Sequence, residues 1–390
     1  MFSTRLHWDA SPNKLSTLLA EKRRSGARIL DLTESNPTAA GFEYPPAMLA
    51  PLSGAGSLLY EPLPAGLPSG REAVAQYYAA RNEAVTAERV MLTTSTSESY
   101  GYLFKLLCDP GDEVLVPRPS YPLFDFLAAL ESVRVVQYPL ACHGEWSIDF
   151  AALEASLTQR SRAIVLVNPN NPTGSFLKKS ELERLVAVCR DHALAIISDE
   201  VFADYAFEAD ERRVASLVEI DAVLTFCLSG LSKVSALPQM KLGWLVVGGP
   251  EVQRREALER LEWIADTYLS VGTPVQHALP GLLAARVPVQ QQMKRRLRDN
   301  LAHLRERLAA DGTVRLLPVE GGWYATLQVP HVKSEEEWTL DLLETCGVLT
   351  QPGFFYDFES EAFLVLSLLT HETDFREGLD LILERVAATL

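Results

Sequence analysis

Between residues 89 and 249, short apolar runs alternate with longer stretches in which apolar residues recur at helical spacing. The runs are rich in β-branched residues and end at turn residues, which is typical of strands buried on both faces of a parallel sheet. This alternation predicts an α/β fold with a mostly parallel sheet flanked by helices. The expected strands are 89–93, 113–117, 134–138, 163–167, 193–197, 223–228 and 243–247. The expected helices are 98–108, 123–130, 180–192, 251–268 and 289–311.

Outside this region the pattern changes to strands that follow one another with few helices between them. Such an order predicts a smaller α+β unit with an antiparallel sheet. We expect a large domain over residues 46–280, and a small domain built from both chain ends, 1–45 and 281–390. The expected strands here are 29–32, 314–318, 323–329, 348–350 and 363–368, and the expected helices are 14–25, 71–82, 335–344 and 374–387.

The composition is that of a globular protein large enough for two domains, with 390 residues of which 47% are apolar and 22% charged. The net charge of −15 argues against nucleic acid or an anionic membrane as a partner. Five scattered cysteines without a CxxC pair predict reduced thiols, with neither a disulfide framework nor a metal site. We find no membrane-spanning run and no signal peptide, so we expect a cytoplasmic protein.

Polar side chains gather where the expected strands end. Residues 168–174 read Asn-Pro-Asn-Asn-Pro-Thr-Gly and follow one strand, and Asp199 follows the next. Lys233 comes shortly after the run 223–228, and a hydroxyl-rich segment, 94–98, opens a helix. In open α/β sheets, ligands bind beyond the carboxyl ends of the strands. We therefore expect these groups to share one rim.

Lys233 is the most informative of these residues. Ser229 and Gly230 interrupt the apolar run before it, which would place the lysine in a loop at the rim. Burial lowers the pKa of a lysine and frees its lone pair to form a Schiff base with an aldehyde. A surface lysine after a strand is the ordinary alternative, and only the neighbouring groups favour the chemical interpretation.

The groups around Lys233 suit pyridoxal phosphate. The helix N-terminus carrying Ser95, Thr96 and Ser97 offers N–H groups and hydroxyls to the phosphate, although serine and threonine also cap ordinary helices. Asp199 can pair with the pyridine nitrogen and keep the ring an electron sink, although a structural ion pair would look the same.

Two further residues could complete the cofactor site. Asn171 can donate to the phenolic oxygen of the ring, and Tyr121 can stack on its face. A plain Asn-Pro turn and simple aromatic packing are the alternatives. The combination on one rim is what favours a cofactor site.

At this point the chain resembles the class I/II aminotransferases, which are fold-type I pyridoxal-phosphate enzymes, from about Leu30 to its C-terminus. The succession of Asn-Pro-x-Asn-Pro-Thr-Gly, Asp-Glu-Val and Ser-Lys is the specific part of this resemblance. Its landmarks are Tyr60, Gly66, Arg71-Glu-Ala73, Asp109-Pro-Gly-Asp-Glu-Val-Leu-Val-Pro117, Pro119-Ser-Tyr-Pro122, Asn168-Pro-Asn-Asn-Pro-Thr-Gly174, Asp199-Glu-Val201, Ser232-Lys233, Leu242-Gly-Trp244, Gly321-Gly-Trp-Tyr324 and Pro352-Gly353.

The resemblance implies a homodimer with active sites at the subunit interface. It implies that Lys233 forms the Schiff base with the cofactor and shuttles the proton, and that Asp199 binds the pyridinium. Asn171 would bind the phenolic oxygen and help with the substrate carboxylate, and Tyr121 would stack on the ring. Tyr60 would reach the phosphate of the partner subunit.

Three cofactor-site positions depart from the family pattern. Phe202 stands where the family usually has a tyrosine that donates to the phenolic oxygen, so we expect a raised pKa at the cofactor imine. Lys241 replaces the arginine that binds phosphate, which keeps the charge but loses the bidentate fork. Gly230 replaces a serine, although Ser229 is adjacent and remains a candidate phosphate ligand.

The largest departure concerns the substrate. The family's arginine for the substrate carboxylate belongs to an Arg-x-Ser strand, and Val365 takes its place here. Arg5, Lys14 and Arg376 are conceivable substitutes, although a surface role is the ordinary expectation for each.

We expect a pyridoxal-phosphate-dependent aminotransferase that moves an amino group between an amino acid and a 2-oxo acid. Val365 keeps a β-lyase or a decarboxylase open as alternatives. A non-enzymatic effector-binding module is a remote one, because the sequence has no DNA-binding extension.

Overall fold

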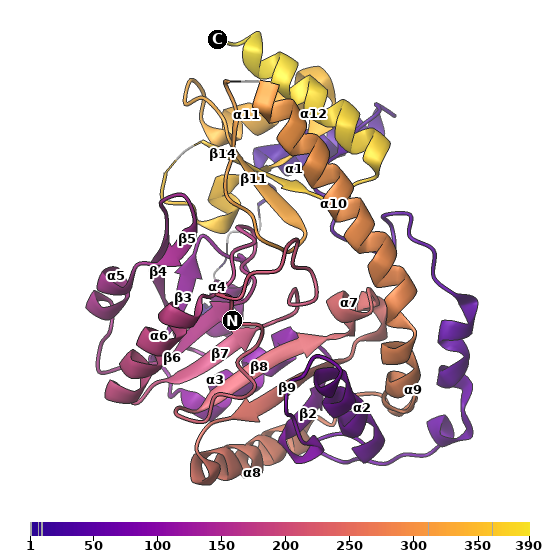
Figure 1. The fold of residues 1–390 in the computed structure, drawn as a ribbon, viewed down its shortest axis with the longest axis vertical. Coiled ribbons are helices and arrows are strands. Elements are labelled where there is room, and N and C mark those ends of the chain that lie inside the picture. Colours follow the sequence, from indigo (N-terminus) through magenta and orange to yellow (C-terminus); the bar gives the residue numbers. More distant parts are fainter. Residues whose placement is uncertain (1, 7, 9–10, 311, 361) are drawn as a thin grey trace.

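The computed structural model describes residues 2–6, 8, 11–310, 312–360 and 362–390. Figure 1 shows a large sheet with its helices in the lower part of the view and a smaller sheet beneath long helices at the top. The large sheet has eight strands in the order β2-β9-β8-β7-β6-β3-β4-β5. Their bounds are β2 Val90–Thr93, β3 Glu113–Arg118, β4 Arg134–Cys142, β5 Trp146–Ile148, β6 Ser161–Val167, β7 Ala195–Asp199, β8 Thr225–Gly230 and β9 Gly243–Gly248.

The strand directions confirm the predicted mostly parallel sheet. Strands β8, β7, β6, β3 and β4 pair in parallel, whereas β9 is antiparallel to both β8 and β2, and β5 is antiparallel to β4. The carboxyl ends of β2, β3, β4, β6, β7 and β8 therefore lie along one edge of the sheet. That edge is where an open α/β sheet places its ligand site.

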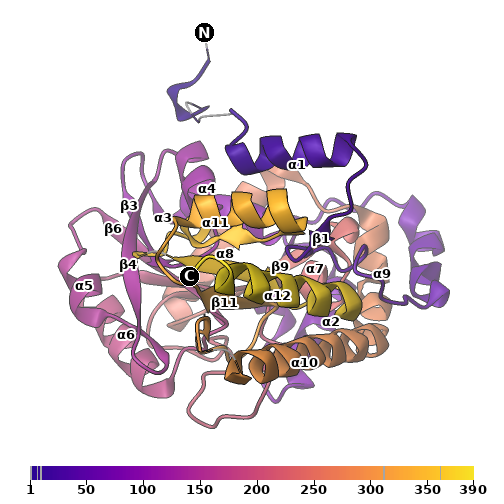
Figure 2. The same cartoon turned by 90° about the horizontal axis from the view of Figure 1, so that it is seen from above.

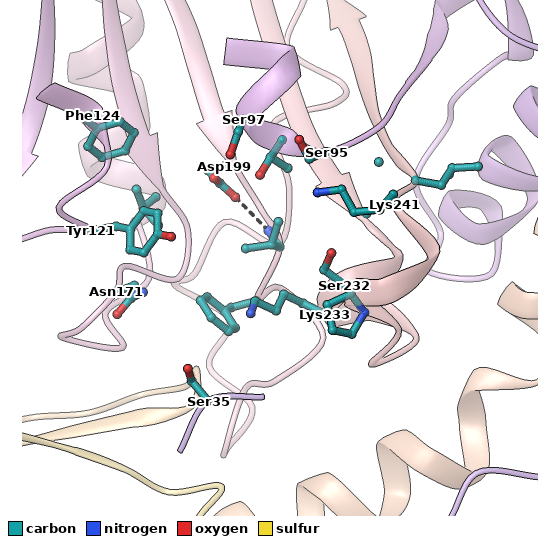
Figure 3. Close-up of a pocket in the computed structure, with 18 of the residues that line it drawn as sticks. Ser35, Ser95, Ser97, Tyr121, Phe124, Asn171, Asp199, Ser232, Lys233 and Lys241 are labelled. Carbon is teal, nitrogen blue, oxygen red and sulfur yellow. Dashed lines mark hydrogen bonds between the residues drawn. The ribbon is translucent and has the colours of Figure 1, made fainter. Parts of the chain in front are cut away.

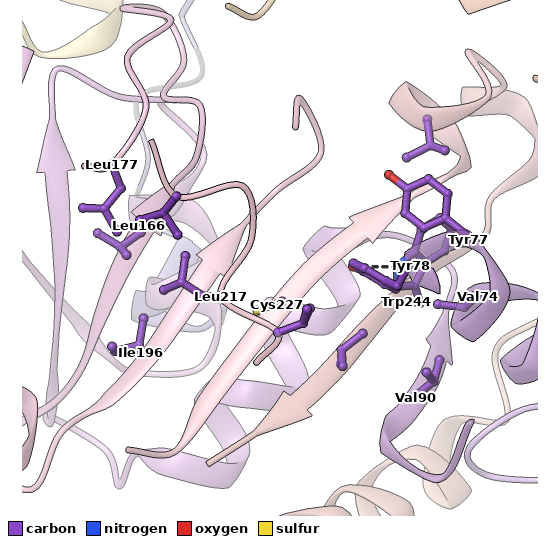
Figure 4. Close-up of a cluster of buried hydrophobic side chains, with 14 of the residues drawn as sticks. Val74, Tyr77, Tyr78, Val90, Leu166, Leu177, Ile196, Leu217, Cys227 and Trp244 are labelled. Carbon is purple, nitrogen blue, oxygen red and sulfur yellow. Dashed lines mark hydrogen bonds between the residues drawn. The ribbon is translucent and has the colours of Figure 1, made fainter. Parts of the chain in front are cut away.

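Helices cover both faces of this sheet because its strands are apolar on both sides. Ile196 and Ile197 of β7 are both fully buried, yet they belong to different hydrophobic clusters, one on each face. Figure 4 shows the first cluster, in which Trp244 donates to the Tyr78 hydroxyl over 3.3 Å. The first face is covered by α2 (Pro68–Ala79), α5 (Phe150–Ala155), α6 (Lys179–Asp191) and α9 (Thr273–Ala284), and the second by α3 (Thr96–Leu107), α4 (Phe124–Leu130) and α8 (Glu251–Tyr268).

The smaller part joins the two ends of the chain. β1 (Leu30–Asp31) pairs in parallel with β12 (Val348–Leu349). A separate antiparallel sheet has the order β10-β11-β14-β13, with β10 at Arg315–Leu316, β11 at Tyr324–Gln328, β13 at Gln351–Pro352 and β14 at Phe363–Ser367. The helices around these sheets are α1 (Lys14–Arg24), α10 (Arg286–Ala310), α11 (Glu335–Asp341) and α12 (Glu372–Ala387), and Figure 2 shows them from above. The domain boundaries expected from the sequence stay a prediction.

Some local expectations were wrong. Residues 273–284 form α9, a helix that was not expected; Pro274 lies in its first turn and Pro280 inside it. The segment 348–350 was expected to join the antiparallel sheet, but β12 pairs with β1 instead. Strand β8 does not break at Ser229-Gly230. It continues because Ser229 and Gly230 pair with Trp244 and Gly243 of β9.

None of the described helices combines the length and the apolar character needed to cross a bilayer.

Candidate active site

A cavity of about 330 Å³ opens at the carboxyl edge of the large sheet, where the start of β11 faces it. Figure 3 shows it with side chains from β7, α3, α7 (Leu231–Val234) and the loop after β6 pointing inward. Nine of the residues singled out in the sequence line this one cavity: Ser95, Thr96, Ser97, Tyr121, Asn171, Asp199, Phe202, Lys233 and Lys241. Residues from five separate segments thus meet at the edge that the strand pattern indicated.

Lys233 lies in α7, a single helical turn that begins directly after β8. The Tyr205 hydroxyl donates to the backbone oxygen of Lys233 over 2.7 Å and fixes this turn. The ammonium group lies over two aromatic rings, 4.6 Å from the centroid of Trp323 and 5.7 Å from that of Phe202. Burial lowers the pKa of Lys233 to about 8, although the negative charge of Asp199 acts in the opposite direction. The lysine therefore holds a larger neutral, nucleophilic fraction near neutral pH than an ordinary lysine does.

Asp199 ends β7 and is the acidic group of the cavity. Its carboxylate accepts hydrogen bonds from the Val201 backbone N–H over 3.2 Å and from the Tyr100 hydroxyl over 3.3 Å. Burial raises the pKa of Asp199 to about 6, and these two hydrogen bonds and the charge of Lys233 only partly offset it. A cationic ligand would stabilise the charged form of this buried carboxylate, so the site favours binding of a cation.

The N-terminus of α3 forms another wall. Ser95 is the N-cap, and its hydroxyl accepts from the Glu98 N–H over 3.2 Å, so the ordinary capping interpretation holds while the residue also lines the cavity. A Cβ on Gly243 would lie 3.2 Å from the Ser95 carbonyl carbon, so glycine lets β9 approach the helix start. In Figure 3 the Lys241 side chain lies beside Ser95. This end of the cavity is suited to a phosphate.

Asn171 belongs to the loop after β6 and is 8% exposed. Its Oδ1 is buried and finds no hydrogen-bond partner among the described residues. A Cβ on Gly174 would collide with the Gly321 carbonyl oxygen, so this loop packs tightly against the segment that leads into β11. Tyr121, by contrast, is 45% exposed, and Figure 3 shows its ring at the cavity wall, between Phe124 and Asn171. The unpartnered Oδ1 of Asn171 implies a ligand with a hydrogen-bond donor at this position.

Two proposed cofactor ligands lie elsewhere. Ser229 is buried inside β8 and does not line the cavity, where Ser232 takes a place instead. The reason is that β8 continues through Gly230, so the rim starts later than expected. Tyr60 is 76% exposed and lies away from the cavity of its own chain, so its expected contact with a partner subunit stays a prediction.

The carboxylate-binding candidates also stay apart from the cavity. Val365 is buried in β14. Arg5 donates to the Leu130 backbone oxygen over 2.8 Å, Lys14 pairs with Glu336 over 2.7 Å, and Arg376 is exposed on α12. None of these four residues lines the cavity.

The residues present fit pyridoxal phosphate. A nucleophilic lysine, a buried carboxylate, the Asn171 amide with its Nδ2 donor and a hydroxyl-rich helix N-terminus suit the aldehyde, the pyridine nitrogen, the phenolic oxygen and the phosphate respectively. The described part of the chain holds no cluster of three or more side chains suited to a metal ion.

Sequence reasoning missed several residues of the site. Tyr100 and Ser35 contact the site or line it, and so do Trp323 and Tyr324, which were landmarks of the resemblance without a role in the site. The Gly-Gly-Trp-Tyr run at 321–324 carried a signal, since it opens a strand with two aromatic residues. Nothing local marked Ser35, because its position depends on a pairing between residues far apart in the sequence.

Comparison with known proteins places the chain in one family. The family model for aminotransferase class I and II matches residues 30–377. A glutamate-pyruvate aminotransferase of Escherichia coli is 32% identical over 274 residues, which cover 67% of this chain and 66% of that relative, so the match spans slightly less than two thirds of its length. An alanine aminotransferase of Mycobacterium tuberculosis is 28% identical over 93% of this chain and 86% of its own length.

Solved structures share the fold over the whole chain. An alanine aminotransferase from Pyrococcus furiosus superposes with a TM-score of 0.90 at 24% identity and covers 100% of both chains. A mutant aspartate aminotransferase from Thermus thermophilus gives a TM-score of 0.85 at 26% identity over 99% of both chains. Because the family model matches residues 30–377, which are most of this chain, the chain belongs to the class I and II aminotransferases.

Proposed function

We propose that this protein is a pyridoxal-phosphate-dependent aminotransferase that moves an amino group between an amino acid and a 2-oxo acid. The observation that carries the proposal is the meeting of Lys233 and Asp199 in one cavity, with opposed pKa shifts and the serine-rich start of α3 beside them. The names of the relatives, which are alanine and glutamate-pyruvate aminotransferases, support the same reaction class.

The residues take the following parts in this proposal. Bound pyridoxal phosphate supplies an aldehyde that joins amines covalently and a ring that withdraws electrons from the attached carbon. Asp199 holds the pyridine nitrogen in its protonated form, and the N-terminus of α3 with Lys241 holds the phosphate. Asn171 donates to the phenolic oxygen. The Lys233 Nζ takes the proton from the substrate Cα and later delivers it, for which a pKa near the working pH is suited.

Trp323 and Phe202 shape the surroundings of the lysine. Both rings are buried and lie against the lysine amine, and the burial of this amine lowers its pKa. Tyr205, by holding the backbone of Lys233, keeps the amine directed at the cavity.

We infer a cytoplasmic homodimer. Leu58, Leu59 and Tyr60, together with Trp263 of α8, are strongly exposed, and so many large apolar side chains favour burial against a second copy. Tyr60 of the same exposed segment would then lie close to the other copy.

The test is covalent labelling of the lysine. Borohydride treatment of the cofactor-loaded protein should add the mass of the reduced cofactor to the peptide that contains Lys233, and Lys233→Ala should prevent this. A loaded wild-type protein should also convert its absorbance to that of the pyridoxamine form when mixed with amino acids. A protein that takes up no vitamer, or a Lys233→Ala variant that transaminates at the wild-type rate, would refute the proposal.

A further inference from the structure

The cavity lacks a cation where an amino acid would place its carboxylate. Among the described residues that line it, the charged ones are Asp199, Lys233 and Lys241. Lys233 is committed to the cofactor, and Lys241 lies beside Ser95 at the phosphate end. Arg118, the arginine closest in sequence to Tyr121, pairs with Glu359 and does not line the cavity. An ordinary substrate carboxylate would therefore meet only uncharged groups of this chain.

The opposite end of the cavity is built from hydroxyls. Figure 3 places Ser35 across the cavity from Ser95 and Lys241, with Lys233 between them. Ser35 lies within hydrogen-bonding reach of the Tyr324 hydroxyl, and both residues line the cavity. Burial raises the pKa of Tyr324 to about 12, so its hydroxyl remains a neutral donor at physiological pH.

The sheet behind Tyr324 confirms that this wall is uncharged. Residues directly opposite each other in an antiparallel pair share a face, as do residues two apart along a strand. Tyr324 lies opposite Ser367, and Thr326 lies opposite Val365, which in turn lies opposite Gln351 of β13. Among the described residues of this face the one cationic side chain is Arg315 of β10, which lies opposite Gln328, is exposed and does not line the cavity. The buried Thr326 hydroxyl has no partner among the described residues.

Strand β14 also fixes the position of Ser35. The Ser367 N–H donates to the Leu32 backbone oxygen over 2.7 Å, and the Ser367 hydroxyl donates to the backbone oxygen of Glu34. The N-terminal turn is thus attached to the same strand that backs Tyr324. The pair of hydroxyls is a built feature of the wall and does not depend on a loose loop.

We propose that Tyr324 and Ser35 receive the substrate carboxylate through neutral hydrogen bonds, and that the enzyme therefore also uses primary amines without a carboxylate as amino donors. This inference presupposes the proposed aminotransferase. In the further activity, a primary amine and a 2-oxo acid give an aldehyde and an amino acid. The donor carbon is oxidised, the oxo carbon is reduced, and the water consumed in one half-reaction is released in the other, so no further oxidant is needed.

Amines should react because the interaction that they lack, the one between a carboxylate and the two hydroxyls, is small. A hydrogen bond from a neutral hydroxyl to a carboxylate contributes less than a bidentate ion pair with arginine, which adds an opposite charge and a second parallel bond. Losing the carboxylate should therefore cost an amine only a modest part of its reactivity, and desolvating a carboxylate in a cavity without a cation offsets part of that.

The experiment compares matched donors on the cofactor-loaded enzyme. Single-turnover rates are measured for alanine against ethylamine and for tyrosine against tyramine, from the loss of the bound pyridoxal absorbance. Of alanine and tyrosine, we take the one that reacts faster. We expect its second-order rate constant to exceed that of the matching amine by less than about 100-fold, which corresponds to two hydrogen bonds of moderate strength. A ratio above that value in both pairs would overturn the inference alone. Absence of conversion with every donor would refute the aminotransferase proposal, and the inference with it.

Variants locate the carboxylate. Tyr324→Phe and Ser35→Ala should each raise the apparent dissociation constant of the amino acid about 5-fold more than that of its amine. Tyr356→Phe is the matched control, because Tyr356 is a buried tyrosine nearby that does not line the cavity, and it should affect both donors alike.

A binding measurement independent of turnover completes the test. Calorimetric titration with 3-phenylpropionate, a carboxylate without an amino group, should show weaker binding to both Tyr324→Phe and Ser35→Ala than to the wild type. Equal affinities in all three proteins would contradict the assignment.

Discussion

Lys233 and Asp199 are the clearest case of single residues whose chemistry is set by their surroundings. Burial favours the neutral form of each residue. It lowers the pKa of the lysine to about 8 and raises that of the aspartate to about 6. Perturbed groups of this kind cluster at functional sites, and the cofactor offers each of them a partner. In the protein without cofactor, both should therefore lower the stability of the fold near neutral pH.

The charge of Asp199 can be tested through stability. Because its folded pKa of about 6 exceeds the usual 3.8, the group favours the folded state below pH 4 and loses that contribution as the pH rises through 6. Asp199→Asn should then raise the free energy of unfolding of the cofactor-free protein at pH 7.5 by up to about 3 kcal/mol. Denaturant titration measures this, and the gain should shrink at pH 5. A destabilised variant at pH 7.5 would contradict the expectation.

Phe202 leads to a second prediction at this scale. Its ring lines the cavity close to the Lys233 amine, where a tyrosine hydroxyl would reach the cofactor's phenolic oxygen. Phe202→Tyr should stabilise negative charge on that oxygen and lower the pKa read from the absorbance of the bound cofactor by about one unit. Titration of the absorbance between pH 5 and 10 gives the value for both proteins. If it does not move, Phe202 is not beside that oxygen.

Among the elements, the start of α3 has two tasks. Ser95 caps the helix through its hydroxyl, whereas Thr96 and Ser97 line the cavity in the first turn. The capping task requires a serine for local reasons, and the same N-terminus presents N–H groups to an anion. Stability and phosphate binding are therefore coupled at Ser95 but separable at Ser97.

Ser97→Ala tests this separation. It should weaken binding of pyridoxal phosphate about 10-fold and leave binding of pyridoxal, which has no phosphate, nearly unchanged. Ser95→Ala is the comparison variant, because it should also lower the melting temperature through loss of the cap. Equal losses for both vitamers in Ser97→Ala would argue against a phosphate at this helix.

At the scale of the whole molecule, a largely buried ionic group joins the large sheet to the smaller one. Glu320 precedes β11, and its carboxylate accepts from the Lys178 Nζ over 2.7 Å and from the Arg213 Nε over 2.7 Å. The segment that it anchors continues into Trp323 and Tyr324, both of which shape the site. Removing one partner from such a group leaves an unpaired buried charge.

Glu320→Gln should therefore lower the free energy of unfolding by about 3 kcal/mol. Glu145→Gln is the control, because Glu145 pairs with Arg212 at the exposed surface and its loss should cost less than about 1 kcal/mol. Urea unfolding of the two variants gives the comparison. A cost for Glu320→Gln no larger than that of the control would show that the group does not hold the two parts together.

The sequence by itself determined the large sheet and most of the cofactor cavity. Alternation of strands and helices determines which strand ends share an edge of the sheet. Lys233, Asp199 and Asn171 each lie at or shortly after the end of a strand, so the position of that edge determines where they lie. Local pattern carries this information because burial on two faces demands apolar residues at every position of a strand.

Only the tertiary structure decided the substrate end. Ser35 and Tyr324 are 289 residues apart in a chain of 390, and they meet because β1 pairs with β12 and Ser367 holds the N-terminal turn. The strand extension through Gly230 likewise depended on Gly243 in the neighbouring strand, which moved Ser229 out of the cavity. Pairings between distant segments are set by packing and by backbone hydrogen bonds across the fold, and a local pattern of apolar and polar residues does not encode them.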